Sequence, residues 1–159
     1  MTKIVASIEI NAPVQEVFAF ASDWRRWKDW LIGLSGFRPT VGITLGNGTR
    51  YAYRASILGL ALDLETEIHD YEKNVGWRGV AISGISHSTQ WVFEPEDGRT
   101  RLTHILEYDL PLQFLGALLD RFLMRPRWRR RLKESLGNLK RILESQKESK
   151  PAHENAAGI

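Results

Sequence analysis

The chain has 159 residues, 43% of them hydrophobic and 26% charged, and it contains no cysteine. This length and composition predict one globular domain with a sizeable core and exclude a disordered or fibrous chain. The lack of cysteine excludes disulfides, thiolate catalysis, iron–sulfur clusters and Cys-ligated zinc, and it suits a reducing cytosol. No apolar run is long enough to span a membrane, and Glu9 interrupts any N-terminal export signal. We therefore expect a cytoplasmic protein.

The formal net charge of +3 is unevenly distributed. Residues 1–111 hold 11 Lys and Arg against 14 Asp and Glu, a net charge of −3, whereas residues 112–159 hold 11 against 5, a net charge of +6. The basic excess is densest in residues 121–133, which contain six arginines, one lysine and no acid. An anionic partner would therefore meet the last third of the chain.

Residues 4–10 alternate apolar and polar side chains, which predicts a half-buried strand. Pro13 suits the first position of a helix over residues 14–21. Asp23 can cap a second short helix, in which tryptophan recurs every third residue up to Trp30. Several glycines and a proline then predict a loop over residues 33–48, with one short strand near residues 41–45.

Five further strands are predicted where apolar and polar side chains alternate between turn signals. They span residues 49–57, 60–71, 74–82, 87–94 and 100–109, and Asp97-Gly98 marks a hairpin between the last two. Apolar residues 115–122 then follow at helical spacing, and Pro126 starts a separate helix that continues to about Ser145. Residues 146–159 are expected to form a flexible polar tail, which leaves one domain over residues 1–145.

This order of elements favours an α+β fold. Consecutive antiparallel strands curl, and their apolar face needs a cover. The C-terminal amphipathic helix is the one predicted element long enough to provide it. A curved sheet wrapped on a helix leaves a cavity unless large side chains fill it.

Residues 7–20 resemble the opening signature of the START-like superfamily (SRPBCC, Bet v 1-like). Their sequence is Ser-Ile-Glu-Ile-Asn-Ala-Pro-Val-Gln-Glu-Val-Phe-Ala-Phe. More narrowly, the chain resembles bacterial polyketide cyclase/dehydrase and coenzyme-Q-binding-type proteins. The tryptophan-rich segment 24–30 fits the pattern of those proteins. Later segments also fit it, namely residues 48–50, 93–95 and 98–103 and the terminal helices over 115–143.

The resemblance covers roughly residues 2–145 and implies a helix-grip fold. This is a seven-stranded curved antiparallel sheet wrapped around a long C-terminal helix, with two short helices after the first strand. It also implies an apolar ligand cavity, because members bind lipids, quinones, polyketides or hormones, and a minority catalyse cyclisation or dehydration. Fold analogy does not choose among these activities. We expect no cofactor.

His104 is the most informative candidate, because the similar family strand usually has an apolar residue there. A two-residue turn at Asp97-Gly98 pairs His104 with Trp91 and Tyr108 with His87, on one cavity wall. A neutral imidazole can bind a ligand carbonyl or hydroxyl, or act as a general base. The alternatives are a buried histidine bonded to a neighbour, or a face displaced by one residue of register.

We expect the cavity wall to combine aromatic, aliphatic and histidine side chains, with ordinary core packing as the alternative for the aromatic ones. The expected members are Tyr51, Tyr53, Leu64, Trp77, His87, Trp91, His104, Leu106, Tyr108, Leu115, Leu119 and Phe122. For Trp24, Trp27 and Trp30, packing beneath the sheet is favoured over a rim at the entrance.

Two other clusters are expected to be inert. Asp63, Glu65 and Glu67 alternate with apolar residues, which places them on a solvated face rather than in an acid/base pair. A metal site built from His69, His87 and His104 is disfavoured, because His69 shares that outer face and no histidine pair has helical i, i+4 spacing. We expect no metal.

The arginine cluster is expected to form a basic surface patch. Its members are Arg125, Arg127, Arg129, Arg130 and Arg131. The favoured interpretation is the wet face of the last helix; contact with anionic lipid headgroups comes next. Nucleic acid is not expected as a partner.

Three functional hypotheses follow. The first is a binder or carrier of a hydrophobic small molecule, such as a lipid, a quinone or a polyketide-like compound. The second is a polyketide cyclase/aromatase or dehydratase, in which His104 moves protons with Tyr108 or His87. The third is a membrane-peripheral module that docks through residues 121–133.

Overall fold

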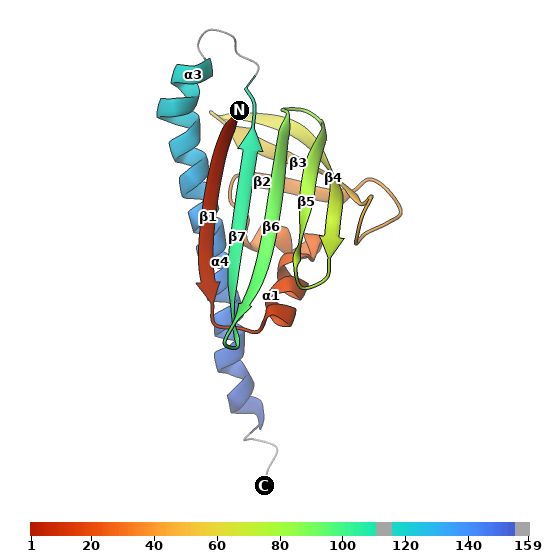
Figure 1. Cartoon of the computed structure of the whole chain (residues 1–159), viewed down its shortest axis with the longest axis vertical. Helices are drawn as coiled ribbons and strands as arrows, with labels where there is room; N and C mark the ends of the chain where they lie inside the picture. Colours follow the sequence, from red (N-terminus) through yellow and green to blue (C-terminus); the bar gives the residue numbers. More distant parts are fainter. Residues whose placement is uncertain (111–115, 155–159) are drawn as a thin grey trace.

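The fold is seen in a computed structural model that describes residues 1–110 and 116–154. A seven-stranded antiparallel sheet curls around one long helix, and short helices close the far end of the sheet (Figure 1). The strand order is β1-β7-β6-β5-β4-β3-β2, so the first two strands of the chain form the two edges. The predicted helix-grip architecture is confirmed.

The N-terminal elements follow the predicted order. They are β1 (Thr2–Ile10), α1 (Val14–Ala21), the 3-10 helix η1 (Trp24–Arg26) and α2 (Trp27–Trp30). Pro13 is the N-cap of α1, where its missing N–H costs no hydrogen bond. The Asp23 carboxylate accepts from the Arg25 backbone N–H and caps η1, as predicted.

One predicted strand was misplaced. The structure places β2 at Leu34–Pro39, and residues 41–45 lie in a loop. Glycine and proline are tolerated in β2 because it is an edge strand whose pairing with β3 is interrupted by a bulge between Ser35 and Arg38.

The remaining strands agree with the prediction to within a few residues. They are β3 (Arg50–Ile57), β4 (Leu60–Glu72), β5 (Gly76–Ser83), β6 (His87–Glu96) and β7 (Arg99–Tyr108). The hairpin register is also confirmed, with His104 opposite Trp91 and Tyr108 opposite His87. At the start of β5, a Cβ on Gly76 would lie 2.0 Å from the Trp91 carbonyl oxygen, so a side chain is excluded there.

The C-terminal helices form one continuous rod, which corrects the predicted break at Pro126. Helix α3 (Gly116–Leu119) leads through a π-helical turn, η2 (Asp120–Met124), into α4 (Arg125–Glu154). In the π turn the Arg125 N–H bonds the Asp120 carbonyl, five residues back. This wide turn gives the Pro126 ring room against the preceding carbonyls, so the helix continues through it. At its other end α4 passes Ser145, where the predicted helix stopped.

The core lies between the concave face of the sheet and the inner face of α4. Leu132, Leu136, Leu139 and Leu143 of α4 are buried against it. Beneath α1, aromatic rings meet edge to face, with Phe18 5.6 Å from Trp77 and 5.0 Å from Phe93. These rings fill the space between α1 and the sheet.

Candidate functional site

A pocket of about 140 Å³ lies between the concave face of the sheet and α4, with α2 and β2 along one side. Its lining is mostly aromatic and aliphatic with a few polar groups, as in most sites for small organic ligands. A cavity of roughly 150 Å³ is known to admit benzene, so the enclosed part of this pocket has room for one ring or a short chain, and the rest of a larger ligand would extend out of its open side.

Nine of the twelve side chains expected in the wall line this pocket. They are Tyr51, Tyr53, Leu64, Trp77, His87, Trp91, His104, Leu106 and Tyr108. They come from strands β3 to β7, and within each strand they alternate with residues on the convex face. Register and pleat thus bring together side chains that lie far apart in the sequence.

The three expected helical members do not join them. Leu115 lies outside the described residues. Leu119 is not part of the lining, and the Phe122 side chain is 68% exposed. The π-helical turn changes the phase of the preceding residues relative to α4, so Phe122 faces outward while Met124 continues the inner stripe of α4.

Several lining residues were missed by the sequence analysis. These are, among others, Trp27, Thr66, Thr89, Met124, Trp128, Arg131 and Ser135. From Met124, the last residue of η2, the inner stripe continues along α4 at the spacing i, i+4, i+7, i+8 and i+11, a periodicity that would have indicated Trp128 and Arg131. Ser135 also fixes the pocket floor, since its hydroxyl accepts from the Ile32 N–H at 2.9 Å.

His104 is buried in the pocket wall, with 3% of its surface exposed. Its ring lies on Trp91, with 3.8 Å between ring centroids. Among the described residues, no hydrogen-bond partner reaches its Nδ1. Burial without a partner lowers the pKa of His104 to about 3, so the ring is neutral at physiological pH.

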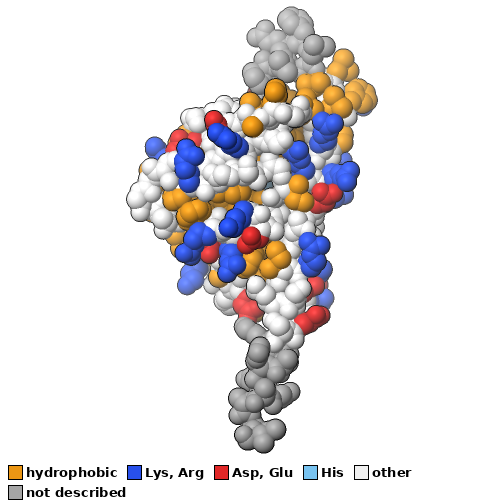
Figure 2. All heavy atoms as spheres, turned by 180° about the vertical axis from the view of Figure 1, so that it is seen from behind, with side chains coloured by type: hydrophobic (Ala, Val, Ile, Leu, Met, Phe, Trp, Pro, Cys, Tyr) orange, Lys and Arg blue, Asp and Glu red, His pale blue; other side chains and the backbone are white. Residues whose placement is uncertain are grey.

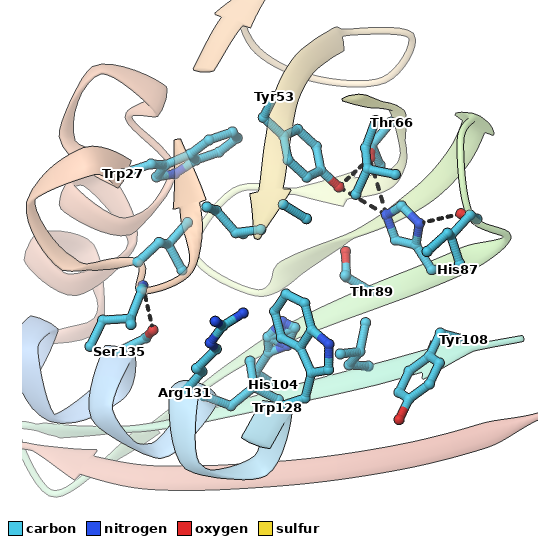
Figure 3. A pocket seen from close by; sticks show the side chains of 18 of the residues that line it. Trp27, Tyr53, Thr66, His87, Thr89, His104, Tyr108, Trp128, Arg131 and Ser135 are labelled. Atoms are coloured by element: carbon cyan, nitrogen blue, oxygen red, sulfur yellow. Dashed lines mark hydrogen bonds between the residues drawn. The ribbon is translucent and has the colours of Figure 1, made fainter. Parts of the chain in front are cut away.

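His87 has partners at both ring nitrogens (Figure 3). Nδ1 lies 2.7 Å from the Ile85 carbonyl oxygen, which can only accept, so Nδ1 carries the proton. The neutral ring therefore accepts at Nε2, where the Tyr53 hydroxyl donates at 2.8 Å. Burial lowers the pKa of His87, and the bond to Ile85 opposes part of that shift.

Tyr53 and Thr66 complete this polar cluster. Because the Tyr53 proton is donated to His87, the Thr66 hydroxyl donates to the Tyr53 oxygen, 2.8 Å away. Burial raises the pKa of Tyr53 to about 12. Tyr53 lies on β3 and His87 on β6, with two strands between them, so only the strong curl of the sheet brings their tips together.

Tyr108, the second residue expected in a catalytic role, is engaged at the other end of the pocket. Its hydroxyl donates to the Asp120 carboxylate, which also accepts from the Thr2 hydroxyl. Burial, followed by the bond to Asp120, raises the pKa of Tyr108. The structure thus assigns its hydroxyl to holding the π turn against β1 and β7.

The three tryptophans near α2 differ in environment. Trp30 is buried against Trp91, with ring centroids 5.5 Å apart, and Trp24 packs at the edge of the core. Trp27 lines the pocket and donates from Nε1 to the Ala21 carbonyl at 2.7 Å. The segment therefore mainly packs beneath the sheet, and one ring reaches the pocket.

The acidic strand residues lie on the convex face, away from the pocket. Asp63 pairs with Arg54 at 2.8 Å and Glu67 with Arg50 at 2.6 Å, across β3 and β4. Within the described parts of the chain, no group of three or more His, Asp or Glu side chains could hold a metal ion.

The helix turns the arginines of the basic segment, residues 121–133, in different directions. Arg127, Arg129 and Arg130 are exposed, Arg125 is partly buried, and Arg131 turns into the pocket wall. On the face in Figure 2, Lys and Arg side chains are scattered among acidic and apolar ones rather than gathered in one patch. No helix in the described ranges is long and apolar enough to cross a membrane.

Comparisons with solved structures agree with this architecture. A protein of Thermus thermophilus (TTHA0849) is 23% identical, with a TM-score of 0.79 over 91% of this chain and 99% of its own. A START superfamily protein from Mycobacterium smegmatis is 15% identical, with a TM-score of 0.63 over 92% and 97%. The di-domain ARO/CYC BexL from the BE-7585A biosynthetic pathway is 15% identical, with a TM-score of 0.65 over 91% of this chain and 47% of BexL.

No curated protein matches the chain. A family model described as "Polyketide cyclase / dehydrase and lipid transport" matches residues 1–144, nearly the whole described fold. None of these comparisons supports a membrane surface as a partner. With the helix-grip fold and its pocket, the match confirms the predicted resemblance to polyketide cyclase/dehydrase proteins: the chain belongs to the polyketide cyclase/dehydrase and lipid transport family.

Proposed function

We propose that the protein binds or carries a hydrophobic small molecule in the pocket between the sheet and α4. The observation that supports this most is the lining, in which aromatic and aliphatic side chains surround a few fixed polar groups. Burial of apolar ligand surface would supply most of the affinity, at roughly 25 cal/mol per Å² before the costs of association. The family description includes lipid transport and is consistent with such a ligand.

The polar groups suit a ligand that carries few oxygens. The Tyr53–His87–Thr66 cluster already satisfies its own protons, so it offers remaining lone pairs to a ligand hydroxyl. The aromatic wall near Trp91 accepts the apolar body. A ligand with one hydrophobic body and one polar end therefore fits better than a sugar or a nucleotide.

Binding can be tested with phenylnaphthylamine, a neutral dye that fluoresces in apolar sites. The pocket tryptophans would transfer energy to bound dye, which reports its location. Ala55 and Ala52 provide a matched pair on β3, because Ala55 lines the pocket and Ala52 lies on the other face. We expect Ala55→Phe to weaken dye binding about tenfold or more by filling the pocket, and Ala52→Phe to leave it unchanged.

Equal binding by both variants would place the dye elsewhere and contradict the proposal, as would no binding by the unaltered protein. If Ala55→Phe does not fold, Ala55→Leu fills less space and serves the same purpose. Native mass spectrometry before and after organic extraction gives an independent measurement, since a co-purified apolar molecule should disappear on extraction.

A second candidate function is a cyclase or dehydratase of polyketide-like substrates, and the Tyr53–His87 pair favours it. Tyr53 could take a proton from the carbon between two ligand carbonyls while its own proton passes to His87 Nε2. The enolate carbon would then attack a third, more distant carbonyl of the ligand, whose oxygen takes the proton back from the relay; loss of the resulting hydroxyl with the remaining proton of that carbon releases water. The lowered pKa of His87 makes it a weak base, which is why binding is the first proposal.

The sequence hypothesis assigned this chemistry to His104 and Tyr108, and the two assignments are separable. A linear triketone would be incubated with each variant and the loss of water followed by mass spectrometry. Tyr53→Phe should abolish turnover if the relay operates, whereas His104→Leu should abolish it if His104 is the base. Turnover that survives both changes would rule out both catalytic assignments.

A further inference from the structure

Arg131 differs electrostatically from every other member of the pocket wall. Among the described residues that line the pocket, it is the only charged side chain. No described carboxylate forms an ion pair with it, whereas its neighbour Arg130 pairs with Glu134 at 2.8 Å. A cation at the edge of an apolar cavity thus has no counter-charge from the described protein.

The guanidinium group is held in place by three elements. Nη1 donates to the Ser56 carbonyl at the end of β3. The guanidinium carbon lies 5.2 Å from the centre of the Trp128 ring, one turn earlier on α4. Gly33, with a φ of +81°, leaves the space that the group occupies, because a Cβ there would lie 2.7 Å from Nη1.

This anchoring leaves donors for a ligand. An arginine has five N–H donors in a rigid fork, and Ser56 accepts from only one nitrogen. Figure 3 shows the side chain extending from α4, beside Trp128, into the space lined by the other residues. The neighbouring polar groups are neutral, because burial keeps both pocket histidines uncharged.

We propose that Arg131 binds the carboxylate of an amphipathic acid whose apolar body fills the pocket; this rests on the proposed binding function. A carboxylate matches one free edge of a guanidinium in size and charge. A phosphate monoester carries up to two negative charges, and no second cation lines the described wall to balance them. The ligand class is therefore a monocarboxylic acid with a compact or short-chain hydrophobic body.

Octanoate and octanol have the same chain length and differ only in the end group. Comparing their affinities therefore separates the contribution of the carboxylate from that of the apolar chain. Each would be titrated against bound phenylnaphthylamine, using the unaltered protein, Arg131→Gln and Arg130→Gln. Arg130 is the matched control, since it precedes Arg131 on α4 and is exposed. Arg131→Lys keeps the positive charge but loses the planar set of guanidinium donors, and it replaces Arg131→Gln in the experiment if that variant does not fold.

The unaltered protein should prefer octanoate to octanol. Arg131→Gln should weaken octanoate binding roughly ten- to hundredfold, the size of a lost charge-assisted hydrogen-bond pair, and change octanol less than about twofold. Arg130→Gln should change neither.

Equal loss of octanoate affinity in both arginine variants would overturn the proposal, and so would a preference for octanol in the unaltered protein. Failure of the binding function itself has a different signature, because neither octanol nor the dye would then bind. Octanol binding without any octanoate preference contradicts only the role of Arg131.

Discussion

The two histidines of the pocket lie in unlike surroundings. His87 has a partner on each nitrogen, so its tautomer and orientation are fixed by Ile85 and Tyr53. His104 is more deeply buried and its ring contacts Trp91 at a tilted angle, with no partner for Nδ1 in the described structure. Burial lowers the pKa of both rings, but only His87 belongs to a network that can move a proton. Hydrogen-bond partners, more than the degree of burial, thus distinguish the histidine that can exchange a proton from the one that only packs.

The largest effect is expected from removing the support of His104. Trp91→Ala takes away a buried ring that contacts His104, Trp77 and Trp30. We expect it to lower the free energy of unfolding by about 3–5 kcal/mol, as for other large-to-small aromatic changes in a core. Urea denaturation at neutral pH measures this. A loss below about 1 kcal/mol would mean that these ring contacts contribute little to stability.

The pH dependence of the free energy of unfolding distinguishes the two buried pocket histidines from exposed histidines. The unfolded chain binds a proton at His104 below its ordinary pKa of 6.5, whereas the folded chain does so only near 3. Stability from this group is therefore present above pH 6.5 and is lost as the pH falls. Between pH 6.5 and 5 the free energy of unfolding should fall by roughly 1–2 kcal/mol from His104 alone.

His104→Leu should flatten that dependence, with a residual slope of the same sign from His87, whose pKa is also lowered. The control is His69→Leu on the convex face, where His69 is exposed and pairs with Glu67. This variant should keep the full slope. If His104→Leu and the unaltered protein have the same slope, the buried ring is already charged or hydrated.

The smallest effect is expected on the His87 side. Tyr53→Phe removes one hydroxyl that bonds both His87 and Thr66. We expect a loss of about 1 kcal/mol in unfolding free energy, the typical net value of a buried hydrogen bond. Tyr71→Phe is the control, because Tyr71 is also an aromatic strand residue and its ring edge packs on Phe18. A loss as large in the control would show that the cluster adds no stability of its own.

The sequence predicted most of the fold because its local signals agreed with one another. Alternation located five of the six later strands, and the Asp97-Gly98 turn fixed the register that places His104 opposite Trp91. Strand β2 was misplaced because Gly36 and Pro39 are typical of loops, and only its edge position makes them acceptable in a strand.

The sequence predicted less of the candidate site than of the fold. The contact between Tyr53 and His87 depends on the amount of curl across β3 to β6, which no local pattern encodes. Arg131 was grouped with its exposed basic neighbours, although helical periodicity from Met124 puts it on the inner face. Phe122 was assigned to the cavity wall from the helical spacing of residues 115–122, in a helix predicted to end before Pro126; the helix instead continues through a π turn, and Phe122 faces outward.

The π-helical turn has one more consequence. A π turn is an α-helical segment with one residue inserted, so deleting Leu123 would restore a regular helix. Everything before the deletion would then rotate by about 100° relative to α4. Asp120 would swing away from Thr2 and Tyr108, which it joins in the present fold. A single-codon deletion in this turn therefore changes the helix phase and would detach the start of the rod from β1 and β7 while leaving the pocket-facing stripe of α4 in place.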